Sequence, residues 1–303
     1  MIHLVTLNPA LDLSVSLGEP TKGKLGKVLY SEVAAGGKAL NVSRFLRKAR
    51  IAHRVWIGTG GGDHPTHVLY RSLLAKERIP VSFLSDTAPI RFNFEINDRK
   101  YNHPGFEEDL TAFSKLLGSV KQGDLLVLTG RLPRDMNDGL YASWVKIFNK
   151  KGVRVTVDTS GKALVLALKT KPWFFKVNLF EFSEAMGKKF KSLDQIGRSL
   201  EKVCLSRGLD HGAITDGVNG AIVWNGRKAY RVKGSSVRSA LVVGAGDGFL
   251  AGYLWSVQKS LDLKDSARNA CALGTTVAGY GIQGFDRADV LRTLKGVKIR
   301  RVS

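Results

Sequence analysis

The sequence predicts an α/β fold, with a mostly parallel central sheet and helices on both of its faces. Along most of the 303 residues, short apolar runs of strand length alternate with segments whose apolar side chains recur at helical spacing. This order is typical of parallel sheets, whose strands need a helical crossover between them. Apolar residues make up 44% of the chain, enough to build a large core. We expect a single domain over residues 1–303.

The first part of the chain interrupts this alternation with a small β flap. Residues 13–17 and 27–33 alternate apolar and polar side chains, as half-exposed strands do. Residues 91–96 show the same alternation, so we expect a lid built from about residues 13–34 and 91–103. The other elements expected in this part are strands at 1–7, 52–58 and 80–84 and helices at 36–50, 66–78 and 107–117.

Beyond residue 120, strands and helices follow one another steadily. Short apolar runs bounded by glycine and polar residues predict buried strands. A glycine-rich turn over 216–220 joins two of them, at 212–215 and 221–224. The remaining strands are expected at 124–129, 153–157 and 173–177, the helices at 137–151, 163–168, 267–280 and 287–294, and a strand that turns into a helix at 241–253.

A net charge of +21 is spread along the chain and is not gathered in an arm or tail. A basic field attracts anionic substrates or nucleic acid, but scattered Lys and Arg are typical of a solvated surface. Trp56, Trp144 and Trp255 lie within apolar runs, which suits core packing better than stacking on bases. The pattern disfavours nucleic acid as a partner.

The two cysteines, Cys204 and Cys271, lie in apolar, helix-like stretches, and neither belongs to a set with metal-ligand spacing. We expect both to be free thiols in the core. The apolar runs are too short to span a membrane, and the first residues lack a basic leader and a cleavage site. These features predict a cytoplasmic protein that does not bind membranes.

The chain is organised around the motif LVVGAGDGFLAGY at 241–253, where an apolar run meets glycines and a carboxylate. Gly244, Ala245 and Gly246 let the backbone approach a ligand, so that the first amides of the helix can point at an anion. Asp247 lies in the same turn and can take a proton from an attacking hydroxyl. Such amides beside a carboxylate are what phosphoryl transfer needs. The alternative is that Asp247 only caps the helix.

A second helix start follows Gly36 and Gly37. Lys38 lies in its first turn, where the positive end of the helix dipole disfavours a cation unless an anion lies beside it. A phosphate ligand would resolve this conflict, and Asn41, about one turn further on, can share that ligand. The alternative is an exposed lysine on a basic helix.

Two more polar residues stand at the ends of predicted strands. Asp12 follows the first strand, at the sheet edge where open α/β proteins bind ligands, and can accept hydrogen bonds from substrate hydroxyls. Arg91 opens a strand of the lid and is a candidate anion ligand. The alternatives are an aspartate that caps a turn and an ordinary arginine at a strand edge.

Asn178 and Glu181 fall on one face of the first turn of a helix. An amide and a carboxylate together can order a hydrated Mg²⁺, although a capping box is an equally natural interpretation. The glycine-rich turn at 216–220 can lie against a nucleotide. His64 and His67 lack a third ligand nearby, so we expect both at the surface.

In their order along the chain, these motifs resemble the phosphofructokinase B family of ribokinase-like sugar kinases. The resemblance runs from residue 4 to about residue 281, and its N-terminal part is similar to the subgroup of 1-phosphofructokinases and tagatose-6-phosphate kinases. It implies a ribokinase-like fold and an ATP-dependent kinase that requires Mg²⁺. The motifs are TLNPALD (6–12), GGKALN (36–41), IRFN (90–93), TGRLP (129–133), DTSG (158–161), KVNLFE (176–181) and VGAGDGFLAG (243–252).

The resemblance also implies roles for individual residues. Asp247 would be the base, and Gly244, Ala245 and Gly246 would form the anion hole for the transferred group. The implied substrate is a ketohexose phosphate, and the first candidates are fructose 1-phosphate and tagatose 6-phosphate. The implied substrate residues are Asp12, Gly37, Lys38, Asn41 and Arg91, and those near ATP and Mg²⁺ are Lys176, Asn178, Glu181, Thr215, Gly217 and Gly220, with Glu181 holding the metal through water.

Several motifs depart from the family pattern beside the ligand. Asp247, its glycines and the Asn178–Glu181 pair are intact, so transfer chemistry is expected to survive, and the substrate is what the changes affect. Arg131 replaces a small hydroxyl residue directly after a strand and a glycine, where it can bind the substrate phosphate or, alternatively, fill the sugar pocket. The departures are Ala39, Ile90, Arg131, Val177 and Val242.

Two hypotheses follow from this comparison. The first is phosphoryl transfer from ATP to a hydroxyl of a ketohexose phosphate. The second, motivated by the departures, is a kinase-like protein that has lost turnover and binds sugar phosphate as a regulatory or interaction module. Lids of this kind can pair between subunits, so a homodimer through the lid is compatible with the sequence.

Overall fold

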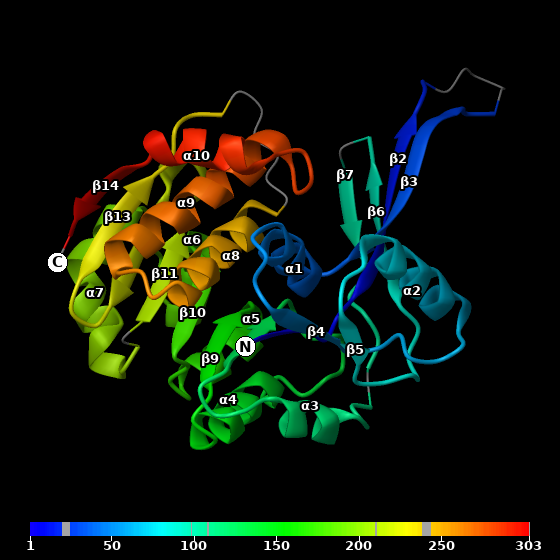
Figure 1. Cartoon of the computed structure of the whole chain (residues 1–303), viewed down its shortest axis with the longest axis horizontal. Helices are drawn as coiled ribbons and strands as arrows, with labels where there is room; N and C mark the ends of the chain where they lie inside the picture. Colours follow the sequence, from blue (N-terminus) through cyan, green and yellow to red (C-terminus); the bar gives the residue numbers. More distant parts are fainter. Residues whose placement is uncertain (20–24, 98, 108, 210, 238–243, 303) are drawn as a thin grey trace.

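The computed structural model describes residues 1–19, 25–97, 99–107, 109–209, 211–237 and 244–302. Within these ranges the strands form a ten-stranded sheet, ordered β14-β13-β12-β11-β10-β9-β8-β1-β4-β5, and a four-stranded sheet, ordered β3-β2-β6-β7 (Figure 1). Neighbours from β11 to β5 run parallel, and β12, β13 and β14 are added antiparallel. The predicted fold class, with helices on both faces and a small flap, is confirmed.

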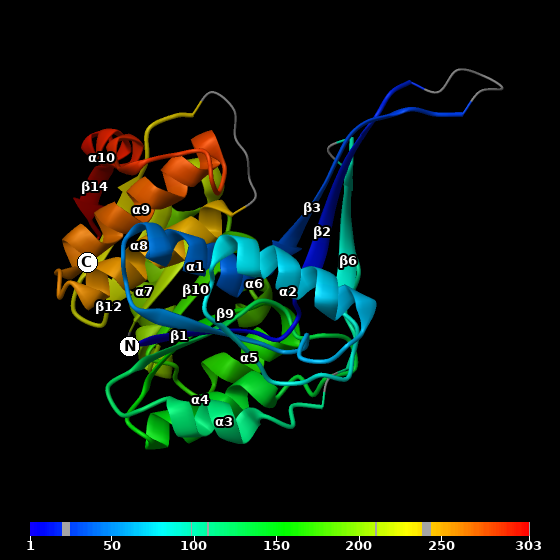
Figure 2. The ribbon, with the colours of Figure 1, turned by 45° about the vertical axis from the view of Figure 1, so that its right-hand side comes forward.

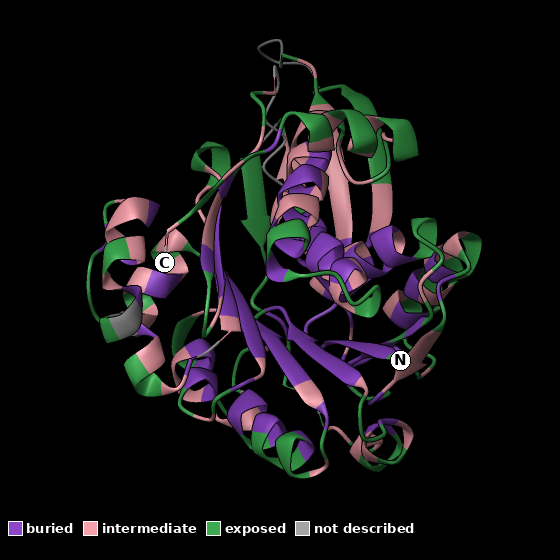
Figure 3. Ribbon diagram, turned by 60° about the vertical axis from the view of Figure 1, so that its left-hand side comes forward, coloured by how far each residue is buried: buried purple, intermediate pink, exposed green. Residues whose placement is uncertain are grey.

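The parallel strands are short and apolar because both faces of the sheet are covered. All five residues of β1 and of β8 are buried, as the purple strands at the centre of Figure 3 illustrate. The strands of the large sheet are β5 Val81–Phe83, β4 His53–Ile57, β1 Ile2–Thr6, β8 Leu125–Thr129, β9 Arg154–Asp158, β10 Phe174–Asn178, β11 His211–Thr215, β12 Ala221–Asn225, β13 Ala229–Lys233 and β14 Lys298–Arg301.

Helices pack on both faces of the large sheet and bury two apolar clusters. Alternate residues of β1 show the division, because Leu4 belongs to one cluster and Val5 to the other. Helices α1 Lys38–Lys48, α2 Pro65–Glu77, α8 Ala245–Gln258, α9 Leu263–Tyr280 and α10 Arg287–Lys295 contribute to the first, and α3 Phe113–Ser119, α4 Leu140–Lys150, α5 Gly161–Leu168, α6 Leu179–Met186 and α7 Leu193–Val203 to the second (Figures 1 and 2).

The four-stranded sheet stands away from the rest of the molecule as a flat projection (Figure 2). It consists of β2 Ala10–Leu17, β3 Val28–Gly36, β6 Arg91–Ile96 and β7 Arg99–Asn102. Strand β2 pairs parallel with β6, so residues from two distant parts of the chain lie side by side at its base. There Asp12 is directly opposite Asn93, and Ala10 is opposite Arg91.

Several sequence predictions need correction. The helix expected at 107–117 begins only at Phe113, since the Ala112 amide directly before it donates to the Leu84 carbonyl outside the helix. Asp12 lies within β2 and not in a turn after β1. His67 is buried and not at the surface, since Nε2 meets the Ala88 carbonyl at 2.8 Å. The strands β13 and β14 and the helix α7 were not predicted.

One further prediction is confirmed, and another concerns residues that the structure does not describe. Cys204 and Cys271 are free and buried, as expected. The predicted strand at 241–243, with Val242, lies outside the described residues. Among the helices in the described ranges, none is both long and apolar enough to cross a bilayer.

Candidate active site

Helix α8 begins at the glycine-rich turn that organises the sequence. Its cap residue, Gly244, has φ 83°, a left-handed conformation that favours glycine. Gly246 packs against a lysine, because a Cβ added there would lie 2.7 Å from Lys176 Nζ. The first amides of α8 therefore lie beside an ammonium group. Together they form a corner at the positive end of the helix that is suited to binding an anion.

Asp247 is the third residue of α8 and its side chain faces helix α1. Its carboxylate Oδ2 accepts a hydrogen bond from Asn41 Nδ2 at 2.7 Å. The residue is only 6% exposed, although an aspartate in a first turn usually points to water. Since Gly244 is the cap residue, capping accounts for neither the burial of Asp247 nor its partner.

Helix α1 starts next to the same corner. It follows Gly37, whose φ of 143° no β-branched side chain would adopt readily, and it places Lys38 in its first turn. Lys38 Nζ donates to Asp158 Oδ1 at 2.8 Å. The anion that the sequence requires beside Lys38 is thus supplied, in this structure, by a carboxylate of the protein. The positive ends of α1 and α8 meet at one place.

Asp158 joins two lysines below this corner. It ends strand β9 and is fully buried, with Lys38 at 2.8 Å from Oδ1 and Lys176 at 3.3 Å from Oδ2. Burial alone would raise the pKa of Asp158, but Lys176 and Lys38 outweigh it and hold the pKa below its usual value. Burial likewise opposes the charge of Lys38, yet Asp158 and Asp247 raise its pKa. Asp158 and Lys38 therefore stay ionised at neutral pH.

Asp247 behaves differently from Asp158. Burial raises its pKa, and the nearby Lys38, Lys176 and Asn41 oppose this rise without cancelling it. A carboxylate with a raised pKa binds a proton more readily. The surroundings of the two buried aspartates therefore shift their pKa values in opposite directions, down for Asp158 and up for Asp247.

Asp12 and Arg91 meet at the base of the small sheet. Asn93 Nδ2 donates to Asp12 Oδ1 at 2.7 Å, and Arg91 Nη1 donates to Asn93 Oδ1 at 2.7 Å. Gly36 makes room for this arrangement, because a Cβ there would lie 2.0 Å from Asp12 Oδ2. Burial raises the pKa of Asp12, with Asn93 and Arg91 opposing the change. An oriented carboxylate of this kind suits the binding of hydroxyl groups.

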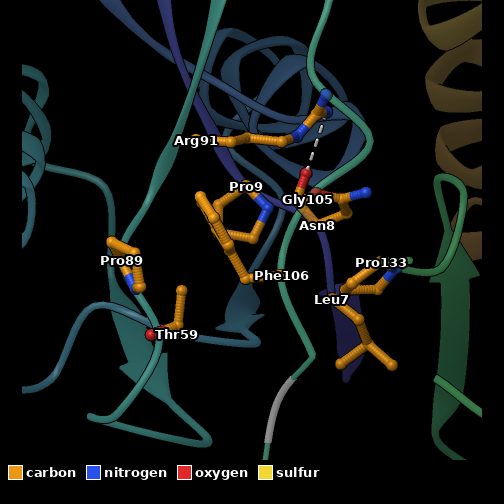
Figure 4. Close-up of a pocket in the computed structure, with 9 residues that line it drawn as sticks. All are labelled: Leu7, Asn8, Pro9, Thr59, Pro89, Arg91, Gly105, Phe106 and Pro133. Atoms are coloured by element: carbon orange, nitrogen blue, oxygen red, sulfur yellow. Dashed lines mark hydrogen bonds between the residues drawn. The ribbon is translucent and has the colours of Figure 1, made fainter. Parts of the chain in front are cut away.

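Arg91 also lines a narrow crevice at the foot of the small sheet (Figure 4). Its Nη2 donates to the Asn8 carbonyl at 3.2 Å, the bond drawn dashed in the figure. Its Nε is buried without a hydrogen-bond partner among the described residues. An unpaired buried donor of a guanidinium is available for an anionic ligand. The crevice is lined by Leu7, Asn8, Pro9, Thr59, Pro89, Arg91, Gly105, Phe106 and Pro133.

The residues expected near a nucleotide follow the neighbouring strands β10 and β11. Asn178 and Thr215 are paired across these strands, so they lie at the same sheet edge as Asp158. Asn178 caps α6 and forms a complete capping box with Glu181, at 2.8 and 2.9 Å. The structure therefore shows the capping box that the sequence allowed. Only Oε2 of Glu181 takes part in it, and Oε1 does not.

The glycine-rich turn after β11 is shaped mainly by backbone packing. A Cβ at Gly220 would lie 2.0 Å from the Val232 carbonyl oxygen, so the fold alone accounts for glycine there. Gly217 has φ 47° and faces open space. Arg131 is exposed, and its Nε donates to Ser160 Oγ at 3.0 Å. That bond attaches Arg131 to the turn after Asp158, whereas Arg91 is bound at the small sheet.

The comparison with known proteins decides the family. The family model described as pfkB family carbohydrate kinase matches residues 6–284. The chain belongs to this family. As a pfkB family carbohydrate kinase, it is an enzyme that phosphorylates a sugar, and membership implies ATP as the phosphoryl donor.

Individual relatives match the pfkB chain almost end to end. The 1-phosphofructokinase of Bacillus subtilis is 29% identical over 311 residues and covers 100% of both chains. That of Rhodobacter capsulatus is 31% identical over 295 residues, 92% of this chain and 90% of the relative. Phosphofructokinase-2 from Escherichia coli, solved with substrates and products, aligns with a TM-score of 0.86 over 97% of this chain and 98% of its own, at 22% identity. The last comparison supports the ribokinase-like fold.

Three residues of the candidate site were not singled out from the sequence. Asp158 lies in the DTSG motif, and its position at the end of a buried strand, like that of Asn178, was the available signal. Asn93 belongs to IRFN and orients Asp12. Arg44, which binds Asn41, carries no local pattern that distinguishes it from the other cations of α1.

Proposed function

We propose that this enzyme transfers the γ-phosphoryl group of ATP to a hydroxyl of a ketohexose phosphate, with fructose 1-phosphate as the first candidate and tagatose 6-phosphate as the second. The observation that carries the proposal is the buried Asp247 beside the first amides of α8 and two lysines. The curated relatives named 1-phosphofructokinase support the choice of sugar.

In this proposal each group has a defined task. Asp247 takes the proton of the attacking hydroxyl through Oδ1, since Asn41 binds Oδ2. The amides of Ala245 and Gly246, with Lys38 and Lys176, stabilise charge on the transferred phosphoryl group. Asp12 holds sugar hydroxyls, and Arg91 binds the phosphate that the substrate already carries. The small sheet acts as a lid over the sugar.

ADP formation with Mg-ATP and a panel of sugars and sugar phosphates tests the proposal. We expect turnover with fructose 1-phosphate or tagatose 6-phosphate and little with unphosphorylated sugars, because the site offers cations to a second phosphate. A protein that binds these sugar phosphates in calorimetry but forms no ADP with any of them would instead support the regulatory alternative.

The described residues fit a hydrated Mg²⁺ and not a metal ion whose ligands are all protein side chains. No group of three or more His, Cys, Asp or Glu gathers as a metal site within the described ranges. Mg²⁺ usually keeps several waters and is held by one or two carboxylates together with substrate phosphates. Glu181, with Oε1 outside the capping box, is the residue that would hold it. Bound there, the ion would neutralise charge on the phosphates of ATP.

Replacing Glu181 by Gln should raise the Mg²⁺ concentration needed for half-maximal activity while sugar binding changes little. The amide of Gln can keep the bond to the Asn178 amide, so the capping box and the fold should survive. A Mg²⁺ titration of activity measures the effect, and Glu184→Gln, an exposed change on the same helix, serves as the control. An unchanged Mg²⁺ requirement would leave Glu181 with the capping role alone.

Replacing Arg131 by Ser should raise the KM for sugar phosphate by about tenfold, the effect of losing one charge-assisted hydrogen bond of at least 1.5 kcal/mol. The exposed side chain at the strand end is free to leave Ser160 for a phosphate. Steady-state kinetics measure the effect, and Arg134→Ser, also exposed, controls for general charge. Activity that appears only in the variant would mean that Arg131 blocks the sugar pocket.

We also propose that the small sheet pairs with its counterpart in a second copy of the chain. It exposes a group of large apolar side chains, which a soluble protein usually covers. Light scattering after size exclusion should show a dimer that Leu29→Asp converts to a monomer. A monomeric parent protein would contradict the proposal. The exposed apolar residues of the sheet are Leu17, Val28, Leu29, Tyr30, Phe94 and Tyr101, and Leu25 lies in the connection between β2 and β3.

A further inference from the structure

A chain of side-chain hydrogen bonds runs from helix α2 to the carboxylate of Asp247. Glu77, the last residue of α2, accepts two bonds from Arg44, one from Nε at 2.7 Å and one from Nη2 at 2.6 Å. Arg44 Nη1 donates to Asn41 Oδ1 at 2.8 Å. Asn41 Nδ2 in turn donates to Asp247 Oδ2 at 2.7 Å. We name these four side chains the Glu77 relay.

The chemistry of Arg44 fixes the direction of the bonds in the Glu77 relay. A guanidinium can only donate, so the Asn41 atom that faces it must be the carbonyl oxygen. The amide nitrogen of Asn41 is thereby turned toward Asp247. Without Arg44 the amide can rotate by half a turn, and its oxygen would then face the carboxylate and repel it. Arg44 therefore favours the same orientation of the Asn41 amide as the Asp247 carboxylate, which can only accept.

We propose that Arg44 is a positioning residue for phosphoryl transfer, which acts on Asp247 by fixing the Asn41 amide. The inference rests on the proposed role of Asp247 as the base. The side chain of Arg44 is only 10% exposed and that of Glu77 25%, so this ion pair is part of the interior and not a solvated surface pair. Its bidentate geometry holds the guanidinium plane in one orientation.

Arg44 also reaches the lid. Its Nη2 donates to the Ala35 carbonyl at 2.7 Å, near the end of strand β3. The next residue is Gly36, which packs directly against the Asp12 carboxylate. One side chain therefore ties the strand beside Asp12 to the Asn41 amide. The Asp12 carboxylate itself is held by Asn93, so the loss of Arg44 should affect Asp247 more than Asp12.

Loss of the relay should change the proton affinity of Asp247 in one direction. The groups that face Asp247 are Asn41 and Lys38 from α1, Asp158 from β9 and Lys176 from β10. Removing Arg44 leaves the three charged groups in place and disturbs only the Asn41 donor. A hydrogen bond to the ionised carboxylate favours the ionised form, so its loss should raise the pKa of Asp247.

Arg44→Ala is therefore expected to lower kcat about tenfold, the value of one hydrogen bond, with KM for sugar phosphate changed by less than about twofold. The acidic limb of the kcat–pH profile should move to higher pH. Arg44→Lys should restore little, because an ammonium cannot replace the fork that holds both Glu77 and Asn41. The matched control is Arg47→Ala. Arg47 also lies on α1 and donates to Glu77, but it bonds the backbone carbonyl of Glu77 and does not contact Asn41.

A double-mutant cycle separates positioning from general stability. If Arg44 acts through Asn41, then Arg44→Ala in an Asn41→Ala background should lower kcat further by less than about twofold. A full tenfold loss in both backgrounds would overturn the relay. Should the parent enzyme phosphorylate no sugar phosphate, the proposed function fails, and the relay is tested by ¹³C NMR titration of the Asp247 carboxyl. An Asp247 titration that Arg44→Ala leaves unchanged would overturn it as well.

Discussion

Replacing Asp247 by Asn is expected to lower kcat for sugar-phosphate phosphorylation by about 10²- to 10⁴-fold, the range for losing a positioned general base. Asn keeps the size of the side chain and its contact with Asn41, but it cannot accept a proton. The KM for ATP should change little, because the amides of α8 and the two lysines remain in place. Steady-state kinetics with fructose 1-phosphate and Mg-ATP measure both quantities.

The same substitution should not destabilise the protein at neutral pH. Burial raises the pKa of Asp247, so the folded state disfavours its charged form, and this cost grows as the pH rises above the usual pKa of an aspartate. Removing the charge therefore leaves the Tm at pH 7 unchanged or higher. A lost activity with a Tm that falls by several degrees would point to a structural role.

Asp265 provides the matched control for this prediction. It is the third residue of α9, as Asp247 is the third residue of α8, but it is exposed. Asp265→Asn makes the same chemical change at the same helical position, away from Lys38 and Asn41. It should leave kcat unchanged. Equal losses in the two variants would mean that a charge in the first turn, and not a base, is what the Asp247 position requires.

Sequence patterns predicted those parts of the site whose residues all lie within one short segment of the chain. The glycines before Asp247 and the pair Asn178–Glu181 were visible because a helix start needs particular residues within four positions. The buried strands were visible for a similar reason, since both faces of the sheet require apolar side chains. Strands β13 and β14 were missed because charged residues interrupt the apolar residues of AYRVK and KIRR, and β14 is the edge strand of the large sheet.

Pairings between distant residues could not be predicted in the same way. The sequence showed that Lys38 needs an anion and suggested a phosphate, but Asp158, 120 residues away, is the group that lies beside it. Asn41 and Asp247 are 206 residues apart, and Arg44 appears only as one cation among several on α1. Such partners follow from the order of the strands in the sheet, which no local pattern specifies.

Replacing Asp158 by Asn should lower the free energy of unfolding by about 3 kcal/mol, near the lower end of the values for breaking a buried ion pair, because Lys38 is partly exposed to screening solvent. Lys176, only 5% exposed, would keep a buried charge without its counter-ion. Urea unfolding at pH 7 measures the loss. Activity should fall too, since Lys176 loses the group that fixes it beside Gly246 and Lys38 loses its hydrogen-bond partner.

The stability difference between the parent and Asp158→Asn proteins should depend on pH in one direction. The folded pKa of Asp158 is held below its usual value, so its stabilisation is fully present above the unfolded pKa of about 4 and is lost as the pH falls through the folded value. The parent and Asp158→Asn proteins should therefore differ most above pH 5 and converge in acid. Asp194 is the control, because it also lies between two cations, Arg231 and Arg300, but is 46% exposed. Asp194→Asn should lower the free energy of unfolding by less than about 1 kcal/mol. Equal losses for the two aspartates, or a gap between parent and Asp158→Asn that widens in acid, would show that the buried pair does not stabilise the fold in this way.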